Sequence, residues 1–336
     1  MKTIVCTEPK SLIIEQRESP VLVNKSDVKI SIKRVGICGT DIHAFGGNQP
    51  FFTYPRVLGH ELSGIVESVG SNVLDIQTGD LVTVIPYMHC GICGSCQNGK
   101  TNCCTEMKVL GVHMDGGMAE SIVVPSSHVF PVNQLSSEMA AMVEPLSIGA
   151  HAVRRSTIQK GETVLVIGAG PIGLGVAKFA KLQGARTIIM DISPERLKFA
   201  KEWTNCDYII VGSDTTEADI LHINNNKLPS IVFDATGNKH SMMKAFDFVC
   251  HGGRLVYVGL VKDTISFFNP DFHSKELTLL ASRNATKEDF EYVIQCMNAG
   301  EINENYVSRV IEFEEIIPLF NNGDFNFNKT LLRFGE

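Results

Sequence analysis

Four cysteines in the first half of the chain are spaced so that they could hold one metal ion. They are Cys90, Cys93, Cys96 and Cys104. Zinc suits four sulfur ligands in a tetrahedron, and a site closed by four protein ligands leaves no position for a substrate. The spacing therefore predicts a structural zinc site, and a loop of free or redox-active cysteines is the alternative. Cys103 offers an extra thiol beside the last ligand, and the spacing favours Cys104 over it only weakly.

A second group of possible metal ligands is spread over a longer stretch of the chain. It consists of Cys38, His60, Glu61 and Glu144. An open zinc site with a free position can lower the pKa of a bound hydroxyl group, which is what alcohol oxidation needs. Taken singly, these residues are unremarkable, since a lone cysteine is usually a buried apolar residue. From the residues alone, this second site is a hypothesis.

A glycine-rich turn between two apolar runs predicts a dinucleotide-binding unit. The run 164–167 is followed by Gly168, Gly170 and Gly173, a helix-like pattern, and a second apolar run that closes on Asp191. In such a turn the glycines allow a sharp bend, the approach of a pyrophosphate, and close packing of the helix on the sheet. An acid at this distance binds the ribose hydroxyls and repels a 2′-phosphate, which favours NAD over NADP. A strand–helix–strand unit without a cofactor is the alternative.

The elements that must position these residues follow two patterns. The first 130 residues contain short apolar runs broken by turn signals, which predict a β-rich region without a repeat. A helical pattern then begins, and Ser137 could cap that helix. Strands and helices alternate over about 160–259, as expected for a parallel sheet. Beyond it, 277–282 predicts a strand, 287–300 a helix that ends at a glycine, and 329–334 a last strand that returns to the first region.

Composition limits the classes of protein that this chain can represent. Its 336 residues, 44% of them hydrophobic, are enough for two domains with full cores. A formal charge of −7 argues against a nucleic-acid or anionic-membrane surface. The N-terminus does not resemble a signal peptide, and no apolar run reaches the roughly 20 residues of a membrane-spanning helix. We therefore expect a cytoplasmic protein, in which clustered cysteines favour a metal site over disulfides.

Several motifs occur in an order that resembles a known family. They are GICGTD at 36–41, GHE at 59–61, the four-cysteine run, DGGMAE at 115–120, EPL at 144–146 and GAGPIG at 168–173. They cover essentially the whole chain and resemble the zinc-dependent medium-chain alcohol dehydrogenases, within the polyol, threonine and sugar-acid branch. The resemblance implies an α/β protein with a GroES-like β-rich catalytic domain at 1–149 and 281–336, and a Rossmann doubly wound parallel-sheet domain at 150–280. It also implies two zinc ions per chain, NAD, and a homodimer or homotetramer.

The resemblance implies roles for residues around the catalytic zinc. Cys38 and His60 match two of its ligands. Glu144 matches the third protein ligand of this branch, or a residue that holds the ion through water. Glu61 matches a neighbour that either supports the ligands or exchanges with them at the metal. Asp41 matches a residue that orients the histidine ligand.

Proton transfer and cofactor contacts are also implied by the resemblance. Thr40 matches the hydroxyl that takes the substrate proton, and His43 matches the outer end of the proton relay. Asp191 matches the ribose anchor, and Arg196 matches a residue near the adenine. The remaining cofactor contacts match the pyrophosphate turn and the loops near the nicotinamide, namely Gly168, Gly170, Pro171, Ile172, Gly173, Thr236, Gly237, Gly259 and Leu260.

The substrate class is narrowed by two further residues. Glu144 stands where the primary-alcohol branch has a cysteine ligand, which points to secondary alcohols on polyhydroxylated or amino-acid substrates. Arg283 matches a position near the substrate in polyol and sugar-acid members, and a surface or cofactor-contacting arginine is its alternative. Phe45, Phe51 and Phe52 either wall the substrate pocket or, as is commoner for such aromatics, belong to the core.

We therefore expect a dehydrogenase that moves a hydride from a secondary alcohol of a sugar acid, such as L-gulonate or L-galactonate, to NAD. L-threonine 3-dehydrogenase and a sorbitol-type polyol dehydrogenase are the alternatives within this class. A nucleotide-sensing protein without turnover is the alternative outside it. The presence of Cys38, Thr40, His43, His60 and Glu144 together argues against that last interpretation.

Overall fold

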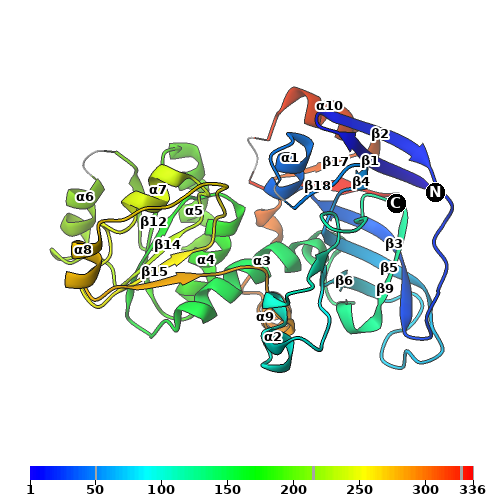
Figure 1. The fold of residues 1–336 in the computed structure, drawn as a ribbon, viewed down its shortest axis with the longest axis horizontal. Coiled ribbons are helices and arrows are strands. Elements are labelled where there is room, and N and C mark those ends of the chain that lie inside the picture. Colours follow the sequence, from blue (N-terminus) through cyan, green and yellow to red (C-terminus); the bar gives the residue numbers. More distant parts are fainter. Residues whose placement is uncertain (50, 214–215, 326–327, 336) are drawn as a thin grey trace. The chain divides into compact units, whose positions relative to one another are not determined.

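The structure is a computed structural model that describes residues 1–49, 51–213, 216–325 and 328–335. Contacts between Cα atoms divide the chain into two compact units, Met1–Glu144 with Thr286–Glu336 and Pro145–Ala285 (Figure 1). The boundaries between these units fall after residues 144 and 285, whereas the family resemblance implies domain boundaries after residues 149 and 280. Among the described residues, no helix combines the length and the apolar character needed to cross a bilayer.

The first unit is built on a mainly antiparallel sheet. Its strands run in the order β10–β6–β5–β3–β18–β17, with β9 paired to β3. Their bounds are β3 (Asp27–Gly36), β5 (Glu61–Val69), β6 (Leu81–Val84), β9 (Ser121–Pro125), β10 (Val129–Pro131), β17 (Arg309–Ile311) and β18 (Thr330–Arg333). Val28, Ile30 and Ile32 alternate along β3 and are buried, as a half-buried strand requires. The predicted return of the last strand is confirmed, because β18 pairs with β3.

Smaller elements complete the first unit. One further sheet joins β2 (Ser11–Gln16), β1 (Lys2–Glu8) and β4 (Arg56–Val57), and β7 (Tyr87–Met88) pairs with β8 (Lys108–Val109). The helices are α1 (Gly39–Phe45), α2 (Gly94–Gln97), α9 (Lys287–Asn298) and α10 (Ile316–Asn322). Helix α9 begins after a Thr286–Asp289 capping box and stops before Gly300, whose φ is +75°. The predicted end of that helix at a glycine is therefore confirmed.

The second unit is a parallel sheet with helices between its strands. The strand order is β13–β12–β11–β14–β15–β16, and every pairing is parallel. Their bounds are β11 (Thr163–Ile167), β12 (Arg186–Asp191), β13 (Tyr208–Val211), β14 (Ile231–Asp234), β15 (Arg254–Tyr257) and β16 (Thr278–Ala281). The helices are α4 (Pro171–Leu182), α5 (Pro194–Thr204), α6 (Thr216–Ile223), α7 (Lys239–Lys244) and α8 (Asn269–Ser274). This confirms the predicted doubly wound α/β fold, whose strand order reverses between β11 and β14.

Helix α3 (Ser137–Ser156) corrects one expectation about a helix cap. Ser136, and not Ser137, precedes the helix, and its Oγ accepts a hydrogen bond of 3.2 Å from the backbone N–H of Met139. The predicted capping role of Ser137 is wrong, because the first helical residue is already Ser137. Two adjacent serines satisfy the same preference, and only the backbone geometry separates them.

Candidate active site

Three of the predicted ligands of the open metal site come together in the first unit. One ligand atom of each of Cys38, His60 and Glu61 lies within 4.8 Å of the other two. Cys38 precedes α1, His60 precedes β5, and Glu61 is the first residue of β5, where it lies opposite Gly36 of β3. Strand pairing therefore assembles the group. A thiolate, an imidazole and a carboxylate are all zinc ligands, so the donor set fits that ion.

Asp41 connects the backbone segments that carry two of these ligands. Its carboxylate accepts hydrogen bonds from the N–H of Cys38 at 2.9 Å and from the N–H of Gly59 at 3.1 Å. It also lies 3.8 Å from Nδ1 of His60, a buried atom for which the described residues supply no hydrogen-bond partner. Burial lowers the pKa of His60, but the negative charges of Asp41 and Cys38 outweigh it and raise the pKa overall. The site therefore favours positive charge at this imidazole.

Glu144 is not a member of this group, but it lies near enough for its charge to act on His60. It is buried on α3, and its Oε1 accepts a hydrogen bond from the hydroxyl of Tyr87, which is also buried. Burial raises the pKa of Glu144 to about 7; the Glu61 carboxylate adds to the rise, and His60 opposes it. Tyr87 lies outside every motif of the sequence, and only its place in β7, three residues before Cys90, connects it with the predicted chemistry.

Lys329 is a second residue that the sequence did not single out. Its buried ammonium forms an ion pair with Glu61 and donates a hydrogen bond of 3.2 Å to the carbonyl of Ile37. Burial lowers the pKa of Lys329, but Glu61 and then Cys38 raise it, and the net shift is upward. Gly36 provides the space for Glu61, because a Cβ at position 36 would lie 1.8 Å from its Oε2.

Thr40 and His43, the residues predicted to carry a proton, lie one turn apart on α1. Thr40 is half-buried and follows Cys38 by two residues, whereas His43 is exposed. Residues three apart on a helix share a face. That these two side chains relay a proton stays a prediction.

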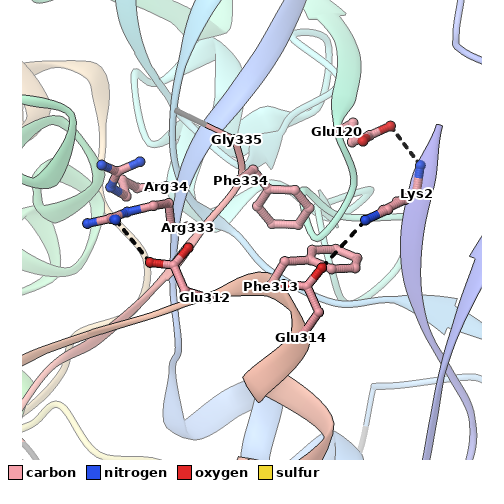
Figure 2. A pocket seen from close by; sticks show the side chains of 9 residues that line it. All are labelled: Lys2, Arg34, Glu120, Glu312, Phe313, Glu314, Arg333, Phe334 and Gly335. Atoms are coloured by element: carbon pink, nitrogen blue, oxygen red, sulfur yellow. Dashed lines mark hydrogen bonds and ion pairs between the residues drawn. The ribbon is translucent and has the colours of Figure 1, made fainter.

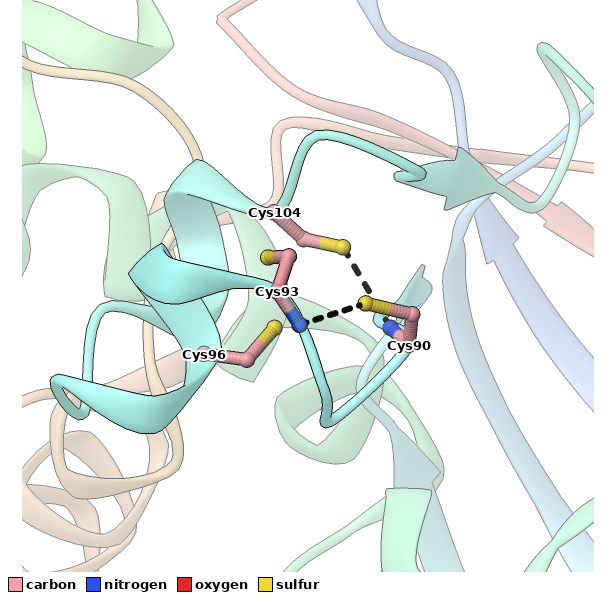
Figure 3. Close-up of side chains that lie close together, drawn as sticks. All are labelled: Cys90, Cys93, Cys96 and Cys104. Carbon is pink, nitrogen blue, oxygen red and sulfur yellow. Dashed lines mark hydrogen bonds between the residues drawn. The ribbon is translucent and has the colours of Figure 1, made fainter.

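The four cysteines predicted to hold a second ion form a compact cluster in the first unit (Figure 3). Their ligand atoms all lie within 4.8 Å of one another. The N–H of Cys90 donates to Sγ of Cys104, and the N–H of Cys93 donates to Sγ of Cys90, each at 3.3 Å. Such donors stabilise thiolates, and the backbone N–H of Cys96 is the main cause that lowers the pKa of Cys93 to about 5. Cys103 is exposed and lies outside the cluster.

The predicted pyrophosphate turn lies at the carboxyl end of β11 in the second unit. Gly168 has φ of +98°, and a Cβ at Gly173 would lie 1.8 Å from the Gly168 carbonyl oxygen, so both positions require glycine. A Cβ at Gly170 would meet no atom of the described residues within 4 Å, which leaves open space at the start of α4, where Pro171 and Ile172 follow. The Asp191 carboxylate lies beside this turn, because it accepts a hydrogen bond of 2.7 Å from the N–H of Ala169.

Two further loops meet at the same edge of the sheet. Thr236 donates its hydroxyl to Asp234 at 2.7 Å, and Gly237 has φ of +61°. A Cβ at Gly259 would lie 2.3 Å from the nitrogen of Gly237, so the loops after β14 and β15 touch. Leu260 in the second of these loops is 70% exposed. Ligands of doubly wound sheets bind at this edge, near the reversal of strand order.

The remaining predicted residues lie in different surroundings. Arg196 is exposed in the first turn of α5, and Arg283 is exposed in the loop after β16 of the second unit. Phe45 is buried and packs edge-to-face against Phe320, with 5.2 Å between ring centroids, so it belongs to the core. Phe51 is 57% exposed and stacks on His113.

A cavity of about 660 Å³ lies in another part of the first unit (Figure 2). Its lining includes Lys2, Arg34, Glu314, Arg333 and Phe334. Its charges pair with one another, since Lys2 lies 3.5 Å from Glu314 and Arg333 lies 2.9 Å from Glu312. It contains none of the predicted ligands or relay residues, so it does not form the candidate active site.

Comparison with known proteins assigns both the β-rich region and the parallel-sheet region to the family that the motifs resemble. The family described as "Alcohol dehydrogenase GroES-like domain" matches residues 24–134, and the family "Zinc-binding dehydrogenase" matches residues 171–299. L-galactonate-5-dehydrogenase from Escherichia coli K12 is 45% identical over 302 residues, which cover 90% of this chain and 88% of that protein.

Two solved structures superpose on nearly the whole chain. The rspB alcohol dehydrogenase from Escherichia coli CFT073, complexed with NADH, superposes with a TM-score of 0.92 at 32% identity and covers 99% of each chain. A zinc-binding dehydrogenase from Sinorhizobium meliloti bound to NADP has a TM-score of 0.92 at 27% identity, again over 99% of each chain. The chain therefore belongs to the zinc-dependent medium-chain alcohol dehydrogenases, in the branch of sugar-acid and polyol enzymes.

Proposed function

We propose that this chain oxidises a secondary alcohol of a sugar acid, of the L-galactonate or L-gulonate type, and transfers the hydride to NAD. The observation that carries this proposal is that ligand atoms of Cys38, His60 and Glu61 lie within 4.8 Å of one another. Thr40 follows Cys38 by two residues in the chain. The similarity to L-galactonate-5-dehydrogenase supports the choice of a sugar acid.

The residues of the first unit would have distinct roles in this reaction. Cys38 and His60 would hold the catalytic ion together with an acid, and Asp41, 3.8 Å from Nδ1 of His60, would keep the imidazole oriented. Zinc held there would supply a Lewis acid that makes an alcohol proton easier to remove at neutral pH. Thr40 would accept that proton through its hydroxyl, and His43 would pass it to solvent. A second zinc would be held by Cys90, Cys93, Cys96 and Cys104 and would stabilise the fold of their loop.

A screen of NAD reduction, followed by NADH absorbance, tests the proposal. The panel contains L-galactonate, L-gulonate, sorbitol and L-threonine, and metal analysis of the same preparation accompanies it. We expect the highest kcat/KM on a sugar acid and about two zinc ions per chain. The highest rate on sorbitol or L-threonine would instead identify a polyol or threonine dehydrogenase. One zinc and no rate on any alcohol would support a nucleotide-sensing protein.

Asp191 is expected to select NAD over NADP. Its carboxylate would accept hydrogen bonds from the ribose hydroxyls and repel a 2′-phosphate. Asp191→Ala should lower kcat/KM for NAD by roughly tenfold to a hundredfold, the value of one or two charge-assisted hydrogen bonds, and change the NADP value much less. Glu202→Ala, on the exposed side of α5, is the matched control and should leave both values unchanged. An unchanged ratio of the two cofactors in Asp191→Ala would refute this role.

Arg283 is expected to recognise the carboxylate of a sugar acid. A guanidinium that pairs with a carboxylate contributes about 1.5–3 kcal/mol, so Arg283→Ala should lower kcat/KM on sugar acids by roughly tenfold to a hundredfold. Neutral polyols should be affected little. Arg155→Ala, which removes another exposed arginine, serves as the control. If acids and polyols lose the same factor, Arg283 does not recognise the carboxylate.

A further inference from the structure

Two buried acids, Glu61 and Glu144, lie near Cys38 and His60. A catalytic metal needs one position left open. We propose that Tyr87 is the positioning residue that decides between these acids. Its hydroxyl holds Glu144 outside the ligand group, so that Glu61 completes the group and the fourth position stays available to the substrate. This inference rests on the proposed function for its catalytic consequence, although its structural core concerns only the residues of the first unit.

The position of the Tyr87 hydroxyl is well determined by its surroundings. Tyr87 is 4% exposed, and its strand β7 pairs with β8 so that Tyr87 lies opposite Val109. Its ring packs edge-to-face against Phe290 of α9, with centroids 6.4 Å apart and planes at 81°. The strand pairing places the backbone of Tyr87, the contact with Phe290 places its ring, and its hydroxyl donates to Oε1 of Glu144.

Glu144 and Glu61 differ in their partners and in their distance from the other ligands. Glu61 is paired with the Lys329 ammonium, yet its carboxylate remains within 4.8 Å of the ligand atoms of Cys38 and His60. Glu144 is bound by a neutral phenol and is outside that group. If both acids bound the ion together with Cys38 and His60, four protein ligands would close the site.

Removal of the phenol hydroxyl would free Glu144. Its buried Oε1 would lose the donor that holds it, and a buried carboxylate without a partner is costly. A divalent cation beside it is the group that can replace the lost donor. In Tyr87→Phe we therefore expect Glu144 to bind the metal and to compete with the substrate for the fourth position.

Cobalt(II) in place of the catalytic zinc makes the number and type of ligands visible in the absorption spectrum, without any substrate. Tyr87→Phe should change the visible spectrum of the cobalt protein and slow loss of the ion to dipicolinate by roughly tenfold, the value of one added ligand contact. The KM for the alcohol should rise by a similar factor. Glu144→Gln alone should leave the spectrum unchanged, because Glu144 is not a ligand in the unaltered protein.

Two variants separate this effect from a general disturbance. Tyr54→Phe removes a hydroxyl that donates to the carbonyl of Ala44, in the same unit, and should leave the spectrum unchanged. In the double variant Tyr87→Phe with Glu144→Gln, the spectral change should disappear.

Three results would overturn the inference. They are an unchanged spectrum in Tyr87→Phe, faster loss of the ion from Tyr87→Phe, and a changed spectrum in Glu144→Gln alone. A chain that shows the expected spectra but oxidises no alcohol would refute the proposed function and leave the role of Tyr87 intact.

Discussion

His60→Ala is expected to remove the catalytic zinc and to lower kcat/KM for sugar-acid oxidation by about 10³-fold or more. The metal contributes several kcal/mol to stabilising the charge that develops on the reacting oxygen, and about 4 kcal/mol corresponds to a factor of 10³. His60 is buried and supplies the one imidazole of the group formed with Cys38 and Glu61, so no other side chain of that group can provide a nitrogen ligand. The zinc content, measured by metal analysis, should fall from about two ions per chain to about one.

An exposed histidine supplies the control for this experiment. His222→Ala removes an imidazole from the surface of α6 in the second unit and should keep both zinc ions and full activity. The circular dichroism spectrum of His60→Ala should match that of the unaltered protein, because the cysteine cluster is separate. If His60→Ala retained two zinc ions, or lost less than about tenfold in kcat/KM, the assignment of this site would be wrong.

Cys104→Ser is expected to release the structural zinc and to destabilise the first unit. A metal present at about 100 to 1,000 times its dissociation constant stabilises the folded state by about 3–4 kcal/mol, and a hydroxyl cannot replace the thiolate. For a unit of this size, such a loss lowers Tm by roughly 6–16 °C. Metal analysis and thermal unfolding of the same sample measure the two effects. The catalytic zinc should remain, because none of its ligands belongs to the cysteine cluster.

The adjacent cysteine is the matched control for Cys104. Cys103→Ser makes the same chemical change one residue earlier, at an exposed thiol outside the cluster. It should retain both zinc ions and the unaltered Tm. If Cys103→Ser lost the zinc and Cys104→Ser kept it, the fourth ligand would be Cys103.

Features that depend on neighbouring residues could be predicted from the sequence. The turn at Gly168 and Gly173, the three closely spaced cysteines, and the helix that ends before Gly300 all follow from local spacing. The alternating strands and helices of the second unit follow from periodicity, and the structure confirms them. The predicted cap of α3 is wrong, because Ser136 and Ser137 present the same local signal.

Family motifs also allowed predictions about residues that lie far apart in the chain. The resemblance named Cys38, His60 and Glu61 as neighbours, and their ligand atoms do lie together. It also named Glu144, which lies nearby and is held by Tyr87 outside that group. Motifs report which residue types accompany one another, but they carry no information on a hydrogen bond from a residue outside them.

The sequence by itself determined the two-part α/β organisation, the cysteine cluster and the glycine turn. Only the tertiary structure decided the partners of the buried acids, which are Tyr87 for Glu144 and Lys329 for Glu61. Lys329 reaches Glu61 because β18 pairs with β3, so that Leu332 lies opposite Val35. A single lysine or tyrosine has no pattern of its own, and its partner depends on the register of strands that meet only in the folded chain.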